Sequence, residues 1–252
     1  MKSVPNTIRK RYSAFDLKLD TLTENLLKKL VVKVNGIVYA VRDYEGVMIV
    51  SSKFELFMLE WFQPRRGEVF VDVGAHVGKY ALSASKVIGN EGLIVAIEAH
   101  PSNFILLEQN IKLNNFKNIV SFNLAAWYKR CKLKFLVGST SANSNLTRYC
   151  YGHGSIDVQA EKMDMLLVRD LDLKRVDWIK IDVEGAEYEV LLGLEETLSK
   201  HKPKLVIEVW SKNIENVRAF LNKLGYDLAR FSGFGEAQSQ CYADVLCIPK
   251  SV

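Results

Sequence analysis

From residue 69 onward, the chain alternates between short apolar runs and longer amphipathic segments of helical length. One such segment, residues 101–115, opens with Pro101, and proline is favoured as the first residue of a helix. Apolar strands that alternate with helices indicate a mostly parallel sheet with helices on both faces. Helical spacing places four apolar residues of segment 101–115 roughly on one face: Phe104, Leu107, Ile111 and Leu113. The sequence offers seven candidate strands: VFVDV, LIVAIE, NIVSFNL, DWIKID, PKLVIEV, YDLARF and ADVLCI.

One stretch of the main domain departs from this alternation. Between Leu124 and Val176, the runs CKLKFLVG and SIDVQAEKM have the composition of strands, where a single crossover helix would otherwise be expected. We therefore predict an inserted strand segment near residues 131–163, within a main domain that spans residues 61–252.

Residues 1–60 differ in character from the rest of the chain. TENLLKKL predicts a short helix over Thr23–Leu30, and KFELFMLEWF predicts a second helix that ends before Pro64. Between them, VVKVNGIVYAV predicts a β-hairpin that turns at Asn35–Gly36. Because an isolated hairpin is only marginally stable, we expect this N-terminal segment to form a cap packed on the main domain.

Composition and charge narrow the classes of protein. The chain has 252 residues, 48% of them hydrophobic, which is typical of a globular domain of enzyme size. A formal net charge of +5 over that length gives no strong signal for nucleic-acid binding. No apolar run approaches the length of a transmembrane segment, and the four cysteines form no metal-binding pattern, so we expect a cytoplasmic protein with reduced thiols. The pattern makes no prediction of oligomeric state.

The stretch VDVGAHVGKY places an acid and two glycines at the end of the first strand of the main domain. Gly74 and Gly78 allow a tight turn and close approach of the backbone to a ligand at the carboxyl end of the sheet, and Asp72 is expected to face that crevice. Glu98 ends the next strand, 20 residues after Gly78, where a carboxylate can bind both hydroxyls of a ribose. Since the paired glycines of a dinucleotide site are missing, these residues indicate a nucleoside ligand without a pyrophosphate.

Four motifs, VDVGAHVGKY, IEAHP, WIKIDVEGAE and KLVIEVW, occur in an order and spacing that resembles the FkbM family of S-adenosylmethionine-dependent methyltransferases. The resemblance covers about residues 70–210 and implies a Rossmann-like class I methyltransferase fold of the α/β class. It also implies that the loop from Gly74 through Ala75 and His76 to Gly78 wraps the methionine part of S-adenosylmethionine, with Asp72 near its amino group. His76 departs from the small polar residue, commonly asparagine, that is usual at this position.

The same resemblance places the rest of the cofactor and suggests the reaction. Glu98 would hold the ribose, and Ala125 and Ala126 would border the adenine. Members of this family are mostly associated with O-methylation, often of sugars, glycoconjugates or other small molecules. We therefore expect a small-molecule or glycan acceptor, with the N-terminal cap and the inserted strand segment as its walls.

Carboxylates at the ends of the fourth and fifth strands are the candidate catalytic groups. An alcohol is a poor nucleophile until it loses its proton, and Asp182, Glu184 and Glu208 are placed to accept one. The alternative for Glu208 is a structural role, in which it caps a helix or braces a loop. Lys180 lies in an apolar strand, where a structural ion pair is the expected role. Two acids as close as Asp182 and Glu208 must share a proton, pair with a cation or bind a divalent metal. We therefore assign no metal as a cofactor, and a divalent cation bound by these carboxylates is the alternative to a shared proton or an ion pair.

Other reactions fit the sequence less well. Amino methylation of nucleic-acid bases commonly uses an Asn/Asp-Pro-Pro-aromatic stretch at the end of the fourth strand, where this chain has DVEG. Methylation of a nucleic-acid base at a carbon atom would require a nucleophilic cysteine at the end of the fourth strand, and none is present. RNA or protein methylation, or a catalytically inactive nucleoside-binding module, are the remaining alternatives to O-methylation of a small molecule.

Overall fold

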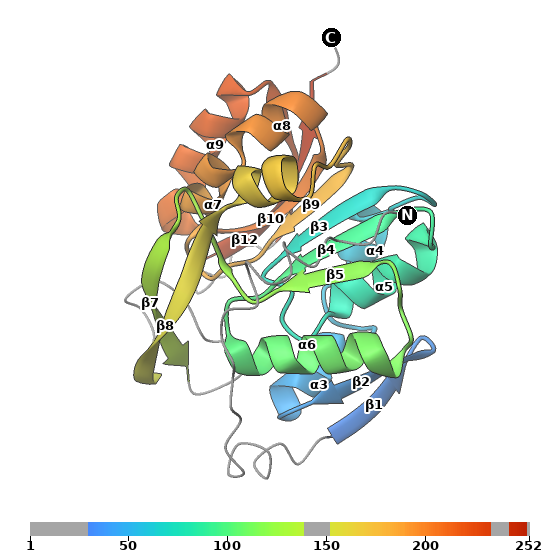
Figure 1. The fold of residues 1–252 in the computed structure, drawn as a ribbon. Helices are drawn as coiled ribbons and strands as arrows, with labels where there is room; N and C mark the ends of the chain where they lie inside the picture. The colour runs from blue at the N-terminus through green and yellow to red at the C-terminus, as the bar shows by residue number, and fades with distance from the viewer. Residues whose placement is uncertain (1–29, 139–151, 233–241, 251–252) are drawn as a thin grey trace.

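A computed structural model describes residues 30–138, 152–232 and 242–250 of the chain. Its centre is a seven-stranded sheet in the order β11-β12-β10-β9-β3-β4-β5, in which β12 alone runs antiparallel to its neighbours (Figure 1). All seven predicted strands are present, which confirms the predicted α/β fold. Their bounds are β3 (Val69–Val73), β4 (Leu93–Ile97), β5 (Ile119–Phe122), β9 (Trp178–Ile181), β10 (Lys204–Trp210), β11 (Tyr226–Ser232) and β12 (Tyr242–Pro249).

Helices cover both faces of this sheet because successive strand residues point to opposite sides. Phe70 of β3 packs with α5 (Lys79–Ile88) and α6 (Pro101–Leu113). Val71, its neighbour, packs on the opposite face. That face is covered by α7 (Glu187–Gly193), α8 (Glu195–His201), α9 (Ile214–Lys223) and the π-helix η1 (Met165–Asp170), and the short 3-10 helix η2 (Ser211–Asn213) precedes α9.

Helix α6 begins as predicted, with His100 as its N-cap and Pro101 in its first turn. The predicted apolar face is correct for Leu107 and Ile111, which are buried, but wrong for Leu113, which is half exposed. The buried face instead includes Asn110, whose side chain bonds the backbone of Ala40 in both directions, at 2.7 and 3.1 Å. A polar residue therefore does the packing that the periodicity assigned to a leucine.

The N-terminal segment rests on α6 through this contact. Its hairpin, β1 (Leu30–Val34) and β2 (Ile37–Val41), turns at Asn35–Gly36 as predicted, and both turn residues have the positive φ that such a turn requires. The predicted helix over Thr23–Leu30 lies outside the described residues except for Leu30, which begins β1. Two short helices follow the hairpin, α3 (Tyr44–Val50) and α4 (Met58–Trp61).

The helix predicted over KFELFMLEWF is mostly wrong, because only α4 is helical. Residues 52–57 form turns, and Glu55 has a φ of +52°, which no α-helix can contain. The Glu55 carboxylate accepts a hydrogen bond from the Tyr80 hydroxyl and lies 3.7 Å from Lys79 Nζ, so contacts with α5 hold this turn. Helix α3, which was not predicted, is capped by Asp43.

The two extra strands predicted after Leu124 are both present. They form an antiparallel pair, β7 (Cys131–Gly138) and β8 (Gly152–Lys162), and β8 also pairs with the short strand β6 (Ala125–Trp127). This second sheet has a small core of its own around Phe135, Val158 and Ala160. Within the described ranges, no helix combines the length and apolar character needed to cross a membrane.

Candidate active site

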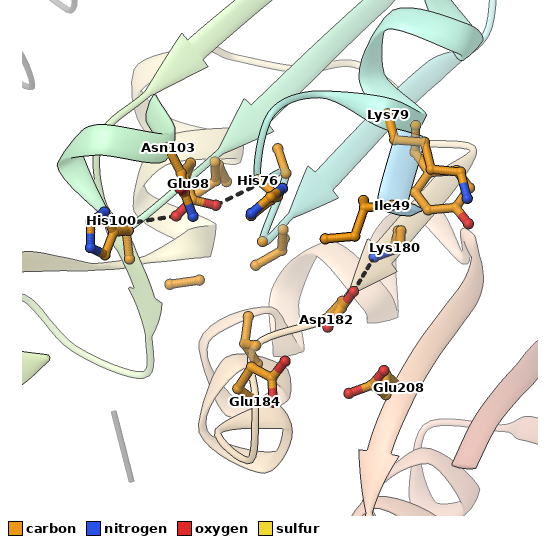
Figure 2. Close-up of a pocket in the computed structure, with 18 of the residues that line it drawn as sticks. Ile49, His76, Lys79, Glu98, His100, Asn103, Lys180, Asp182, Glu184 and Glu208 are labelled. Atoms are coloured by element: carbon orange, nitrogen blue, oxygen red, sulfur yellow. Dashed lines mark hydrogen bonds and ion pairs between the residues drawn. The ribbon is translucent and has the colours of Figure 1, made fainter. Parts of the chain in front are cut away.

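A cavity of about 780 Å³ opens at the carboxyl ends of β3, β4, β9 and β10 (Figure 2). Its walls come from the loops that follow these strands, from β6 and β7, and from α3 and the turn after it. Crevices beyond the carboxyl ends of parallel strands are the usual ligand sites of such sheets. The fold therefore brings the predicted loops and the N-terminal segment to one site.

The two glycines of VDVGAHVGKY are required by the packing of the loop itself. Gly74 has a φ of +80°, and a Cβ atom there would lie 1.8 Å from the backbone oxygen of Asp182. Gly78 has a φ of +94°, and its Cβ would lie 2.4 Å from a methyl carbon of Leu82. Gly74 also lines the cavity, together with Ala75 and His76, whereas Gly78 is not among the described residues that line it.

Asp72 lies beneath the cavity and is absent from its described lining. It is only 1% exposed and stands opposite Lys180 in the register of β3 and β9. Burial raises the pKa of Asp72 to about 6, against the opposing effect of the Lys180 ammonium. The position of Asp72 thus makes it a buried counter-charge to Lys180.

Glu98 lies in the cavity wall and joins two loops. Its carboxylate oxygens accept hydrogen bonds from the backbone N–H groups of His76 and His100, each at 2.8 Å (Figure 2). Each oxygen keeps a second lone pair that can accept a hydroxyl. Burial raises the pKa of Glu98 to about 7, although the two N–H groups oppose this shift.

Ala125 and Ala126 line the cavity just after Leu124, on the side of Glu98. Both alanines are buried, and Phe135 of β7 lines the same wall. Small and apolar side chains around a carboxylate form a wall suited to a flat, mostly apolar ring.

The three predicted catalytic carboxylates meet across the cavity from Glu98. One oxygen each of Asp182, Glu184 and Glu208 lies within 4.8 Å of the other two. Lys180 Nζ donates to Asp182 Oδ2 at 2.7 Å, which is the ion pair expected from the sequence (Figure 2). Burial lowers the pKa of Lys180, but the nearby carboxylates of Asp182 and Asp72 outweigh this effect and leave the pKa above its usual value.

The protonation of this cluster is strongly perturbed. Burial, followed by the charges of Asp182 and Glu187, raises the pKa of Glu184 to about 8. Burial and the charges of Asp182, Glu184 and Asp244 raise the pKa of Glu208 to about 10. Carboxylates this close titrate as one unit, so the cluster holds protons at neutral pH unless a cation binds nearby.

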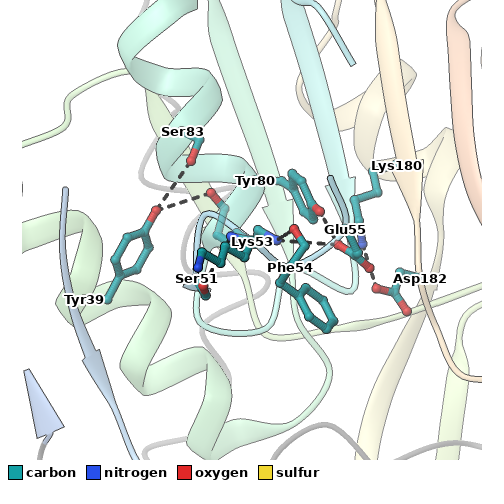
Figure 3. Close-up of polar contacts among 10 residues, drawn as sticks. Tyr39, Ser51, Lys53, Phe54, Glu55, Tyr80, Ser83, Lys180 and Asp182 are labelled. Atoms are coloured by element: carbon teal, nitrogen blue, oxygen red, sulfur yellow. Dashed lines mark hydrogen bonds and ion pairs between the residues drawn. The ribbon is translucent and has the colours of Figure 1, made fainter. Parts of the chain in front are cut away.

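A second group of carboxylates adjoins the first and was missed by the sequence analysis. Oxygens of Glu55, Glu208 and Asp244 lie within 4.8 Å of one another, and Asp244 stands opposite Glu208 in the pairing of β10 with β12. Figure 3 shows Glu55 beside Tyr80, close to the pair of Lys180 and Asp182. An acid inside the apolar run ADVLCI is a signal that could have identified Asp244. Glu55 had no such signal, because it reaches the site through a turn.

The turn DVEG owes its shape to a residue of the same motif. Glu184 has a φ of +54° and Gly185 a φ of +99°, conformations that are costly for a residue with a side chain. Glu187 is fully buried and accepts hydrogen bonds from Gly185 N at 2.6 Å and from Asn213 Nδ2 at 2.5 Å. Glu187 thus braces the turn that carries Glu184.

Either group of carboxylates supplies the hard oxygen ligands that a divalent cation prefers. Lys180 already neutralises part of the charge on the first group, and Lys79 lies near Glu55 of the second. A metal and a protonated cluster are therefore two ways of balancing the same charge.

Comparison with known proteins identifies the family of this chain. The methyltransferase FkbM domain family matches residues 72–228. Methyltransferase sdnD of Sordaria araneosa is 23% identical over 224 residues, covering 76% of this chain and 86% of that protein.

Two solved structures share the fold. Methyltransferase FkbM from Methylobacillus flagellatus KT has a TM-score of 0.53 at 16% identity; the match covers 73% of this chain but only 45% of that one. M. jannaschii TYW2, solved in complex with AdoMet, has a TM-score of 0.52 at 18% identity, over 87% of this chain and 84% of that one. These likenesses support the class I methyltransferase fold, and the match over residues 72–228 shows that the chain belongs to the FkbM family of S-adenosylmethionine-dependent methyltransferases.

Proposed function

We propose that the protein methylates a hydroxyl group of a small molecule, with S-adenosylmethionine as the methyl donor. The observation that carries this proposal is the group of three carboxylates, Asp182, Glu184 and Glu208, inside the cavity and across from Glu98. A hydroxyl acceptor needs a proton acceptor, and this group provides one whose pKa values lie near and above neutrality.

The residues of the cavity fit the cofactor. A volume of about 780 Å³ is within the usual range of small-molecule sites and leaves room for an acceptor beside the donor. Glu98 has free lone pairs for the ribose hydroxyls, and Ala125 and Ala126 form an apolar wall for the adenine. Gly74, Ala75 and His76 are placed to hold the methionine part. Asp72 would act through Lys180, since it does not line the cavity.

When bound, S-adenosylmethionine supplies a methyl group on a positively charged sulfur, which is already electrophilic. The protein then has to hold the acceptor and remove its proton. Lys180 fixes one oxygen of Asp182 and leaves the other to accept a hydrogen bond from the acceptor. Glu184 has the pKa best matched to taking that proton near neutral pH, because catalytic bases work best near the working pH.

The charge of the cavity favours this function over RNA methylation. Six acidic residues line it against two lysines, and even with Glu184 and Glu208 protonated the cavity has no excess of positive charge to attract the phosphates of an RNA. An inactive nucleoside-binding module would need Glu98 and the apolar wall but would have no use for the perturbed carboxylates, which cost stability when they are ionised.

Labelled methyl transfer tests the proposal. The purified chain is incubated with S-adenosyl-[methyl-³H]methionine and with separate pools of small alcohols, sugars, lipids, protein and RNA. We expect label in a hydroxyl-bearing small molecule, and a loss of about 10²-fold or more in Asp182→Asn with cofactor binding intact. Robust labelling of RNA or protein that depends on Asp182 would contradict the choice of acceptor. Full turnover in Asp182→Asn would contradict the catalytic assignment.

A further inference from the structure

Helix α3 presents one face to the cavity. Four of its seven residues line the cavity at helical spacing, namely Tyr44, Glu45, Met48 and Ile49. The opposite face is buried through Gly46 and Val50, so the core fixes the orientation of the helix. The cavity-facing side is thus held in place by packing that does not involve a ligand.

Four residues with large, mostly apolar side chains are exposed around the cavity. Tyr44 is 74% exposed, Met48 46%, Phe54 39% and Tyr242 37%, although all four line the same cavity. Single exposed apolar residues are normal on a protein surface, but several around one cavity mark a binding surface. We call these four residues the apolar mouth.

The carboxylates that line the cavity have the opposite character. Asp182 and Glu208 lie at the ends of neighbouring strands, and Lys180 bonds Asp182 and stands opposite the buried Asp72. A ligand that fills the cavity from the carboxylates to the apolar mouth must therefore be polar at one end and apolar over the rest. Polar groups placed against the mouth would lose water without gaining hydrogen-bond partners from Met48 or Phe54.

The apolar mouth is built from segments outside the family match. Tyr44, Met48 and Phe54 precede residue 72, and Tyr242 follows residue 228, whereas Asp182 and Glu208 lie within the matched range. The family region thus supplies the chemistry of the cavity, and the flanking segments supply the surface that meets the acceptor.

We propose that the acceptor is an alcohol whose hydroxyl is carried by an extended apolar body, with the hydroxyl at Asp182, Glu184 and Glu208 and the body on the apolar mouth. This inference rests on the proposed function and narrows its substrate class: an apolar alcohol is favoured over a free sugar, which has hydroxyls on every side. An apolar body is favoured because its contact with the apolar mouth removes apolar surface from water, and the gain in binding free energy grows with the area buried.

Methionine methyl NMR tests the apolar mouth with a simple probe. Protein labelled with ¹³C at the methionine methyl groups and saturated with S-adenosylhomocysteine is titrated with octan-1-ol, and separately with glycerol. Met165, which is 37% exposed but absent from the cavity lining, is the internal control for Met48. We expect octan-1-ol to shift the Met48 signal saturably, with no comparable shift at Met165 and no shift with glycerol.

Matched variants locate the binding. Tyr44→Ser should weaken octan-1-ol binding at least threefold, whereas Leu59→Ser, which removes a side chain of similar exposure that does not line the cavity, should leave it unchanged. Equal shifts at Met48 and Met165, or a glycerol shift at Met48 as large as that of octan-1-ol, would overturn the proposal. A Met48 shift that follows protein concentration without any alcohol would overturn it in favour of self-association.

The outcome separates this inference from the proposed function. Saturable octan-1-ol binding at Met48 combined with an absence of methyl transfer to any hydroxyl would support the apolar subsite and contradict O-methylation. Methyl transfer to free sugars without octan-1-ol binding would support O-methylation and contradict the apolar subsite.

Discussion

Replacing Lys180 by methionine should destabilise the protein by about 3–5 kcal/mol at pH 8, because it leaves two carboxylates without their shared cation. The Lys180 side chain is 8% exposed, and its ammonium lies 2.7 Å from Asp182 Oδ2 and next to the buried Asp72. Even with Lys180 present, the pKa of Asp72 rises from 3.8 to about 6, which corresponds to about 3 kcal/mol when Asp72 is ionised. Removing the cation raises that pKa further.

The pH dependence of the loss has a defined sign. A carboxyl whose pKa is raised by folding is stabilising below its unfolded pKa, and this contribution disappears as the pH rises through the folded pKa. At pH 5, Asp72 is mostly protonated in both proteins, so the loss caused by Lys180→Met should fall to about half of its value at pH 8. Urea unfolding followed by tryptophan fluorescence at the two pH values measures both quantities.

Two further variants make this experiment decisive. The double variant Lys180→Met/Asp72→Asn should recover more than half of the lost stability at pH 8, because the buried charge is gone. Lys200→Met, at an exposed helical position, should change stability by about 0.5 kcal/mol or less. Wild-type stability in Lys180→Met at pH 8, or no recovery in the double variant, would refute the assignment of Asp72 and Lys180 as a buried charge pair.

Three other results are expected. Gly74→Ala should lower the melting temperature and weaken S-adenosylhomocysteine binding, measured by calorimetry, because the new Cβ would lie 1.8 Å from the backbone oxygen of Asp182. An unchanged affinity would contradict the close approach of the loops that carry Gly74 and Asp182. The ligand-free protein should lose thermal stability as the pH rises from 5 to 8. The pKa values of Glu98 and Asp244 are both raised to about 7, so their contributions to the stability of the folded state vanish over this range. A melting temperature that rises with pH would contradict these shifts. Once an acceptor is known, the rate of methyl transfer should increase between pH 6 and 9, and Glu184→Gln should flatten this increase. An unaltered pH profile in Glu184→Gln would exclude Glu184 as the base. A loss of activity on chelation that Mg²⁺ restores would favour a metal in place of Glu184.

The main sheet could be predicted from the sequence because its strands are buried on both faces. Residues 69–73 are buried throughout, so the run VFVDV carries a signal that tertiary contacts only reinforce. The helix predicted over residues 53–62 failed because its amphipathic pattern competes with the contacts of Glu55 to α5. The prediction that Leu113 is buried was wrong because Asn110 and Asn114 face β2 and form hydrogen bonds with its backbone. A pattern of hydrophobic positions contains no signal for such polar contacts.

The site was predictable where topology alone brings residues together. The ends of parallel neighbours meet at one edge, so Asp182 and Glu208 could be placed near each other from their positions in the sequence. Glu55 and the N-terminal residues of the apolar mouth, Tyr44, Met48 and Phe54, could not, because their approach depends on how the N-terminal segment packs against α5 and α6. Asp72 was placed in the crevice from its position at a strand end, whereas side-chain alternation along β3 puts it beneath the cavity beside Lys180.

Calorimetric titration of the protein with S-adenosylmethionine and S-adenosylhomocysteine tests the assignment of this cavity to the cofactor. We predict that the wild type and Glu91→Ala, which alters an exposed acid far from the cavity lining, bind one cofactor per chain with equal affinity. Glu98→Ala should bind at least tenfold more weakly, since it loses the hydrogen bonds that the ribose hydroxyls would donate to a charged carboxylate, worth about 1.5–3 kcal/mol each. Wild-type affinity in Glu98→Ala, or no binding of either compound to the wild type, would contradict the placement of the cofactor in this cavity.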